Sequence, residues 1–149
     1  MIKQVFTSSF ISIGVGFIFE IVNKIIGATY IYKFFEDSLV TILVALLAVN
    51  AATMGIVLTK IRDLVSESGG SRYFIETRKN MLLSVKEQIG LIISSTVILS
   101  IKSSNIVLSV EYLDLFLNTI VGGVFVYALL ILYDTAKGVL IIIDFDTDD

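Results

Sequence analysis

Several side chains that can carry charge or form hydrogen bonds lie inside long apolar runs of this sequence. They are Glu20, Asn23, Lys24, Asn50, Thr53, Ser95 and Asn118. An amide or carboxyl group without a partner in hydrocarbon is costly, so each of these groups has to face protein or water. We therefore expect them to lie on or near a polar axis between helices, where ions can interact with them.

Asn50 has two interpretations. It is the twelfth residue of an uncharged run of 21 residues, 39–59. The small residues Ala48, Ala52 and Gly55 lie close to it, and small residues let helices approach one another. The structural interpretation is a hydrogen bond between helices, and this run alone favours it. The functional interpretation is a pore-lining position, which the polar groups in the other runs bring into consideration.

The composition argues against an enzyme. The sequence has no His and no Cys, so it lacks the commonest general base, the commonest transition-metal ligand and any thiolate. It contains no Gly-rich phosphate loop, nucleophile elbow or metal-ligand cluster. We expect no catalytic residues, no cofactor and no metal. Pro is absent too, which predicts unbroken helices and weakens the case for transporters built on broken ones.

The apolar residues are grouped in blocks of membrane-spanning length. Hydrophobic residues make up 56% of the chain, and the mean hydropathy is +0.92. A helix of about 20 residues spans roughly 30 Å, the thickness of the hydrocarbon core. We predict an all-α integral membrane protein with four transmembrane helices, at about 4–26, 39–60, 81–101 and 115–134. Residues 1–28 lack a convincing signal cleavage site, so we expect a retained helix.

Basic residues indicate the orientation. Six of the eleven lie between, or near the facing ends of, the second and third predicted helices, at Lys60, Arg62, Arg72, Arg78, Lys79 and Lys86. The positive-inside rule then places a connecting loop, 61–80, in the cytoplasm together with both termini. We predict a multi-pass protein of a bacterial inner membrane. A short amphipathic helix in this loop should extend the third transmembrane helix.

Acidic residues gather at both predicted membrane faces. The outer group is Glu36, Asp37, Glu111 and Asp114, and the inner group is Asp144, Asp146 and Asp148. We assign residues 1–137 to the transmembrane domain and 138–149 to a strand-like acidic tail, in which 144, 146 and 148 would point the same way. Repeated by symmetry, the two groups would form acidic mouths that favour cations. A simply solvated tail is the alternative.

A basic stripe is the last candidate site. Arg72, Lys79 and Lys86 are spaced by seven and share one helix face, with Arg78 beside them. The functional interpretation is a cytoplasmic site for a nucleotide, an oligonucleotide or a lipid headgroup. The alternative, which the pattern favours, is the ordinary positive-inside signal with anchoring to anionic lipid.

The organisation of the chain resembles that of a known group of proteins. It is small and Pro-free, and its one substantial cytoplasmic segment is "RYFIETRKNMLLSVKEQIGLII". In this it resembles the small membrane effectors of bacterial anti-phage operons, such as the channel subunit of the Hailong system. No residue motif is shared, so no residue roles are transferred. The resemblance implies a homo-oligomeric channel, gated by the nucleotide product of a partner nucleotidyltransferase, that collapses the membrane potential.

These observations lead us to expect a homo-oligomeric, cation-permeable ion channel, with a tetramer as the expected assembly. An apolar strand in the tail would need a partner for its backbone, which also favours assembly. Three alternatives stay open. They are a small proton-coupled multidrug-type exporter, a phage holin, and a non-conducting accessory subunit of the membrane.

Overall fold

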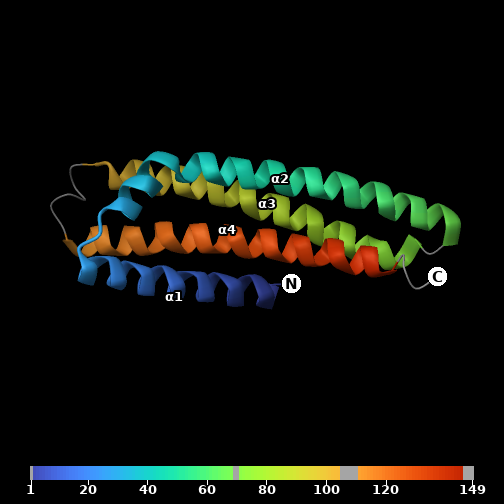
Figure 1. The fold of residues 1–149 in the computed structure, drawn as a ribbon, viewed down its shortest axis with the longest axis horizontal. Helices are drawn as coiled ribbons and strands as arrows, with labels where there is room; N and C mark the ends of the chain where they lie inside the picture. Colours follow the sequence, from blue (N-terminus) through green and yellow to red (C-terminus); the bar gives the residue numbers. More distant parts are fainter. Residues whose placement is uncertain (1, 69–70, 105–110, 146–149) are drawn as a thin grey trace.

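A computed structural model describes residues 2–68, 71–104 and 111–145 of the chain. These ranges form four helices and no strand: α1 Ile2–Ile26, α2 Tyr30–Ser68, α3 Ser71–Lys102 and α4 Glu111–Phe145. Successive helices run in opposite directions, side by side (Figure 1). Each contains a segment long and apolar enough to cross a membrane, namely Val5–Ile26, Tyr30–Asp63, Thr77–Lys102 and Tyr112–Leu140. The prediction of an all-helical, membrane-embedded protein is confirmed at this level.

α2, α3 and α4 are much longer than a bilayer requires, and α1 is the shortest of the four described helices. The 39 residues of α2 and the 25 residues of α1 correspond to roughly 58 Å and 37 Å of helix. The excess lies at the end of the bundle where α1 begins and α4 ends (Figure 1). Residues 61–80, which we expected to form a loop, are helical to Ser68 and again from Ser71. Buried contacts among Met54, Val57, Ile61 and Met81 hold this part of the α2–α3 pair together.

The predicted strand-like tail is wrong for residues 138–145. α4 continues without a break through Gly138 to Phe145, so Asp144 lies on a helix. Val and Ile favour strands only where they pack on a neighbouring strand, and none exists in the described ranges. The residues instead continue a helix that is already nucleated, which adds one hydrogen bond per residue. Asp146 and Asp148 lie outside the described residues.

α4 is the central helix of the bundle. α2, α3 and α4 pack against one another, whereas the backbone of α1 approaches that of α4 alone within the described ranges. The closest approach is at Gly16, where a Cβ atom would lie 2.5 Å from the carbonyl oxygen of Thr119 and 2.6 Å from the nitrogen of Gly123. Glycine is required here because any side chain would separate the two helices.

The turn between α1 and α2 uses a second glycine. Gly27 has a φ of 64°, a left-handed conformation that glycine adopts without strain. The amide of Ala28 donates to the carbonyl of Asn23 at 3.0 Å, the bond that closes a Schellman motif. The motif ends α1 sharply and returns the chain toward α2.

The apolar core lies between α2 and α4, and the outer surface is apolar as well. The core cluster consists of Phe35, Leu39, Leu43, Val121, Val124 and Ala128. Phe10 of α1, by contrast, is 81% exposed, and Phe6 is similarly exposed. Large exposed apolar side chains on a helix of this length suit contact with lipid chains rather than water.

Candidate functional site

A layer of hydrogen-bonding side chains crosses all four helices near the start of α1. Asn50 of α2 donates from Nδ2 to Oε1 of Gln88 on α3 at 2.9 Å. The preceding residue of α3, Glu87, lies close enough to interact with the hydroxyl of Tyr127 on α4, and Tyr127 in turn interacts with Ser9 of α1. We call these five residues the Glu87 layer. It brings one predicted site residue, Asn50, together with four that the sequence did not single out.

Asn50 is completely buried in this layer. Its Nδ2 has a second, longer contact of 3.4 Å with Oγ of Ser84, one turn before Gln88. Its Oδ1 and the Nε2 of Gln88 are buried without a hydrogen-bond partner in the described part of the chain. The amide pair therefore joins α2 to α3 but leaves one acceptor and one donor unsatisfied, each of which carries a desolvation cost.

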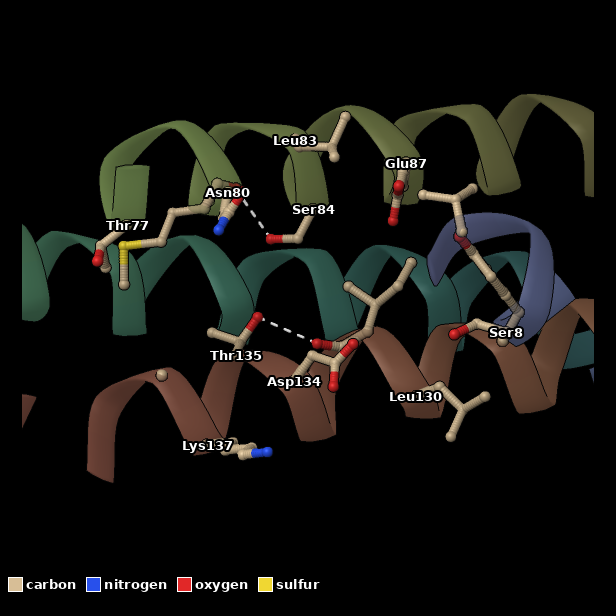
Figure 2. A pocket seen from close by; sticks show the side chains of 15 residues that line it. Ser8, Thr77, Asn80, Leu83, Ser84, Glu87, Leu130, Asp134, Thr135 and Lys137 are labelled. Atoms are coloured by element: carbon tan, nitrogen blue, oxygen red, sulfur yellow. Dashed lines mark hydrogen bonds between the residues drawn. The ribbon is translucent and has the colours of Figure 1, made fainter. Parts of the chain in front are cut away.

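A cleft of about 330 Å³ lies between α1, α3 and α4, and Ser84 is one of its lining residues (Figure 2). Its lining residues are Val5, Ser8, Thr77, Asn80, Met81, Leu83, Ser84, Glu87, Tyr127, Leu130, Ile131, Asp134, Thr135, Lys137 and Gly138. Figure 2 shows the carboxylates of Glu87 and Asp134 projecting toward the cleft from facing helices. Glu87 thus belongs both to the polar layer and to the wall of the cleft.

A second polar layer lies toward the other end of the bundle. Glu20 of α1 is only 6% exposed. Asn118 of α4 donates from Nδ2 to Oε1 of Glu20 at 3.4 Å and to Oδ2 of Asp114 at 3.2 Å. Tyr32 of α2 lies close enough to interact with Glu20. We call this group the Glu20 layer. It unites Glu20, Asn118 and Asp114, three residues that the sequence singled out separately.

An ion pair adjoins the Glu20 layer and brings in α3. Nζ of Lys102 pairs with Oε1 of Glu36 and lies 5.8 Å from the centre of the Tyr32 ring. The space between these side chains is about 10 Å³, room for about one water molecule, and the buried Asn23 lines it. The outer acidic residue Glu36 is therefore neutralised by Lys102, while Asp37 beside it is exposed.

Three predicted axis residues lie outside both layers. Thr53 donates to the carbonyl of Val49 at 2.9 Å, and Ser95 donates to that of Leu91 at 2.6 Å. Each hydroxyl is thus satisfied by its own helix, the usual arrangement for Ser and Thr in transmembrane helices. Lys24 is exposed in the last turn of α1.

The basic stripe lies away from the cleft. Arg78, Lys79 and Lys86 are exposed, and the side chain of Arg72 lies outside the described part of the chain. The side chains of Glu111 and Asp144 are likewise outside it. Among the described residues, no group of three acidic, His or Cys side chains is placed to hold a metal ion.

The spacing of polar residues on α3 is a signal that sequence reasoning missed. Asn80, Ser84 and Glu87 are separated by four and three residues, so they share one helix face. On α4, Tyr127 and Asp134 are seven apart and also share a face. Both faces line the cleft. Lys102 and Tyr32 carried no such signal, because only the packing of α1, α2 and α3 brings them near Glu20.

No family model matches this chain, and neither do any curated protein or solved structure.

Proposed function

We propose that the protein is an integral membrane protein that conducts cations. The observation that carries the proposal is the presence of carboxylates at two levels within apolar, membrane-spanning helices. Glu20 accepts a hydrogen bond from Asn118 and interacts with Tyr32, and Glu87 interacts with Tyr127. Ionisable groups are rare in such helices, and those that occur commonly mark ion or proton pathways.

The charge balance of the two layers supports cations as the permeant species. The Glu20 layer contains Glu20 and Asp114, and the adjoining Glu36 is paired with Lys102. The other layer contains Glu87, with Asp134 across the cleft. Carboxylates thus outnumber basic groups at both levels, and rings or clusters of acidic side chains favour cations over anions.

The path proposed for the ions runs along α4. α4 contributes Asn118 and Asp114 to one layer and Tyr127 to the other, and it forms a wall of the cleft. A homo-oligomer, with a tetramer as the expected assembly, and gating by a nucleotide that binds the basic stripe remain predictions of the sequence and of the resemblance to anti-phage effectors.

The test is current through a planar bilayer that contains the purified full-length protein, with unequal KCl on the two sides. We expect discrete conductance steps and a reversal potential on the cation-selective side. Glu20→Gln and Glu87→Gln should each lower K⁺ conductance or cation preference severalfold. The matched control is Asp63→Asn, which removes an exposed carboxylate beside Arg62, outside both layers and the cleft.

Two results would contradict the proposal. One is the absence of current under two conditions. These are the protein alone, and the protein after addition of a nucleotide extract from cells that express the genes next to its own gene. The other is a current whose size and selectivity are the same in Glu20→Gln, Glu87→Gln and the wild-type protein.

A small proton-coupled exporter is the second candidate, and the cleft is the observation that favours it. A cavity of about 330 Å³ is in the size range of small-molecule sites. Proteoliposomes distinguish the two functions. An exporter would move protons only when a substrate is present, whereas a channel would pass K⁺ down its gradient without one.

A further inference from the structure

We infer that the cleft between α1, α3 and α4 is a binding site for a lipophilic organic cation. The inference concerns the ligand of this cleft and does not require that the protein conducts ions. Its starting point is the shape of the cleft, which is walled by three helices and open on the side where α1 and α3 lack close backbone contact within the described ranges.

The charged groups of the cleft favour a cation. Glu87 and Asp134 face one another from α3 and α4, and Lys137 is the one basic residue among the described side chains that line the cleft (Figure 2). Lys137 is exposed, and its side chain runs along α4 on the side away from the two carboxylates in this view. The described part of the lining thus has two carboxyl groups against one basic group, with Glu87 half-buried and Asp134 exposed.

The hydroxyl groups of the lining increase this preference. Ser84 donates its proton to the carbonyl of Met81 at 2.9 Å, and Thr135 donates to that of Ile131 at 3.1 Å. A hydroxyl has a single proton, so each of these oxygens has only lone pairs left for the cleft. The oxygens of Ser84 and Thr135 can therefore accept from a positively charged donor but cannot donate to an anion.

The apolar walls indicate an organic ligand rather than a metal ion. Val5, Met81, Leu83, Leu130 and Ile131 line the same space. A bare metal ion needs several oxygen ligands in a compact shell, and no group of three metal-binding side chains exists among the described residues. A cation with an apolar body satisfies both the carboxylates and the apolar walls.

The depth of the cleft fits a ligand that enters from the membrane interface. Its lining includes Val5, near the start of α1 at Ile2, and Thr77, near the start of α3 at Ser71. The cleft therefore lies at one end of these helices, where an amphipathic molecule has its charge near water and its apolar part in hydrocarbon. The positive-inside rule predicts that this is the cytoplasmic end.

The probe for the test is tetraphenylphosphonium, a lipophilic monocation of fixed charge. Binding is measured by equilibrium titration on the full chain in nanodiscs of zwitterionic phosphatidylcholine, with empty nanodiscs as the blank for partition into lipid. We expect saturable binding of at most one probe per chain. The anion tetraphenylborate, of nearly the same shape, should show no saturable binding beyond the blank.

Charge variants test the two carboxylates. Glu87→Gln and Asp134→Asn should each weaken binding about tenfold or more, because each removes a carboxylate from a partly desolvated site. Asp134 is exposed, so Asp134→Asn keeps the test informative even if Glu87→Gln fails to fold. Asp63→Asn removes a carboxylate outside the cleft and should leave affinity within about twofold of wild type.

A pair of bulk variants tests the space itself. Leu130→Trp places a large side chain in the cleft and should abolish saturable binding without a change in charge. Leu129→Trp adds the same bulk at the neighbouring exposed position, which does not line the cleft, and should bind as wild type.

The inference is overturned by any of three results. The first is a wild-type protein that does not bind tetraphenylphosphonium saturably. The second is wild-type affinity in both Glu87→Gln and Asp134→Asn. The third is a loss of affinity in Asp63→Asn equal to that in the cleft variants, which would indicate an effect of total charge. The bilayer experiment measures current carried by K⁺ and Cl⁻ and does not use the probe, so the two proposals can fail separately. Probe binding without current would reject the channel alone. Current without probe binding would reject the ligand site alone.

Discussion

The buried side chains of Asn50 and Glu20 have partners on other helices, whereas hydroxyls such as those of Thr53 and Ser95 bond their own helix. Asn50 is held by Gln88, and Glu20 is held by Asn118 and Tyr32. In hydrocarbon these partners replace the water that would otherwise solvate each group. Polar side chains that are expensive one at a time thereby become interhelical contacts.

The amide pair of Asn50 and Gln88 leads to a prediction about stability. Asn50→Leu or Gln88→Leu alone leaves one buried amide without its partner and should lower the free energy of unfolding by about 1–2 kcal/mol. The double substitution removes both amides, including the unsatisfied Oδ1 and Nε2, and should recover most of the loss. Reversible unfolding of the purified protein in mixed detergent micelles measures all three variants.

Thr53→Val is the control for this cycle, because the hydroxyl of Thr53 donates to the carbonyl of Val49 in its own helix. It should change the unfolding free energy by less than about 0.5 kcal/mol. Strictly additive effects of the Asn50 and Gln88 substitutions would show that the two amides are not coupled.

At the scale of elements, the attachment of α1 is the distinctive feature. α1 makes its close backbone contact with α4 alone, and Gly16, Gly122 and Gly123 form that contact. The close approach holds Glu20 against Asn118 at one level and Ser9 near Tyr127 at the other. The position of α1 on α4 therefore determines both polar layers and one wall of the cleft.

Gly16→Ala tests this contact. A Cβ atom at this position would meet backbone atoms of Thr119 and Gly123, neither of which can rotate away. The two helices would have to separate, at a cost of about 1–3 kcal/mol in stability. We expect a lower unfolding midpoint in detergent and loss of a chemical cross-link engineered between α1 and α4.

Gly14→Ala is the matched control, since a Cβ atom there would have nothing within 4 Å. Alanine is the better helix former, so this variant should be as stable as wild type or slightly more stable. Equal destabilisation by both substitutions would mean that the α1–α4 contact does not depend on Gly16.

At the scale of the whole molecule, α1 begins and α4 ends toward the same end of the bundle, although α1 begins well short of the end that α2 and α3 reach (Figure 1). The end of α2 at Ser68 and the start of α3 at Ser71 lie toward the same end, close to most of the basic residues. If the positive-inside rule holds, this end with its extended helices and the cleft lies in the cytoplasm.

Cysteine labelling tests the orientation directly, because the sequence contains no cysteine of its own. Ser103→Cys and Asp63→Cys place thiols at exposed positions near opposite ends of the bundle, and neither changes the count of Lys and Arg. In intact cells, an impermeant maleimide should label the Ser103→Cys variant and reach the Asp63→Cys variant only after permeabilisation. The opposite pattern would show inverted insertion.

The number and type of the helices followed from the sequence alone. Four apolar blocks of membrane-spanning length without Pro predict four unbroken helices, because a backbone in hydrocarbon has to satisfy its own hydrogen bonds. The presence of costly polar groups such as Glu20, Asn50 and Asn118 was also evident, since each one interrupts an apolar run.

Tertiary structure decided how far the helices extend and which polar groups meet. Residues 138–145 are helical although their Val and Ile content suggested a strand, because they continue a helix and have no strand to pair with in the described ranges. The meeting of Glu87 with Tyr127, and of Glu20 with Tyr32, depends on the rotation and offset of packed helices. Those quantities are set by contacts such as that of Gly16 with α4, which join residues about a hundred positions apart and leave no local pattern in the sequence.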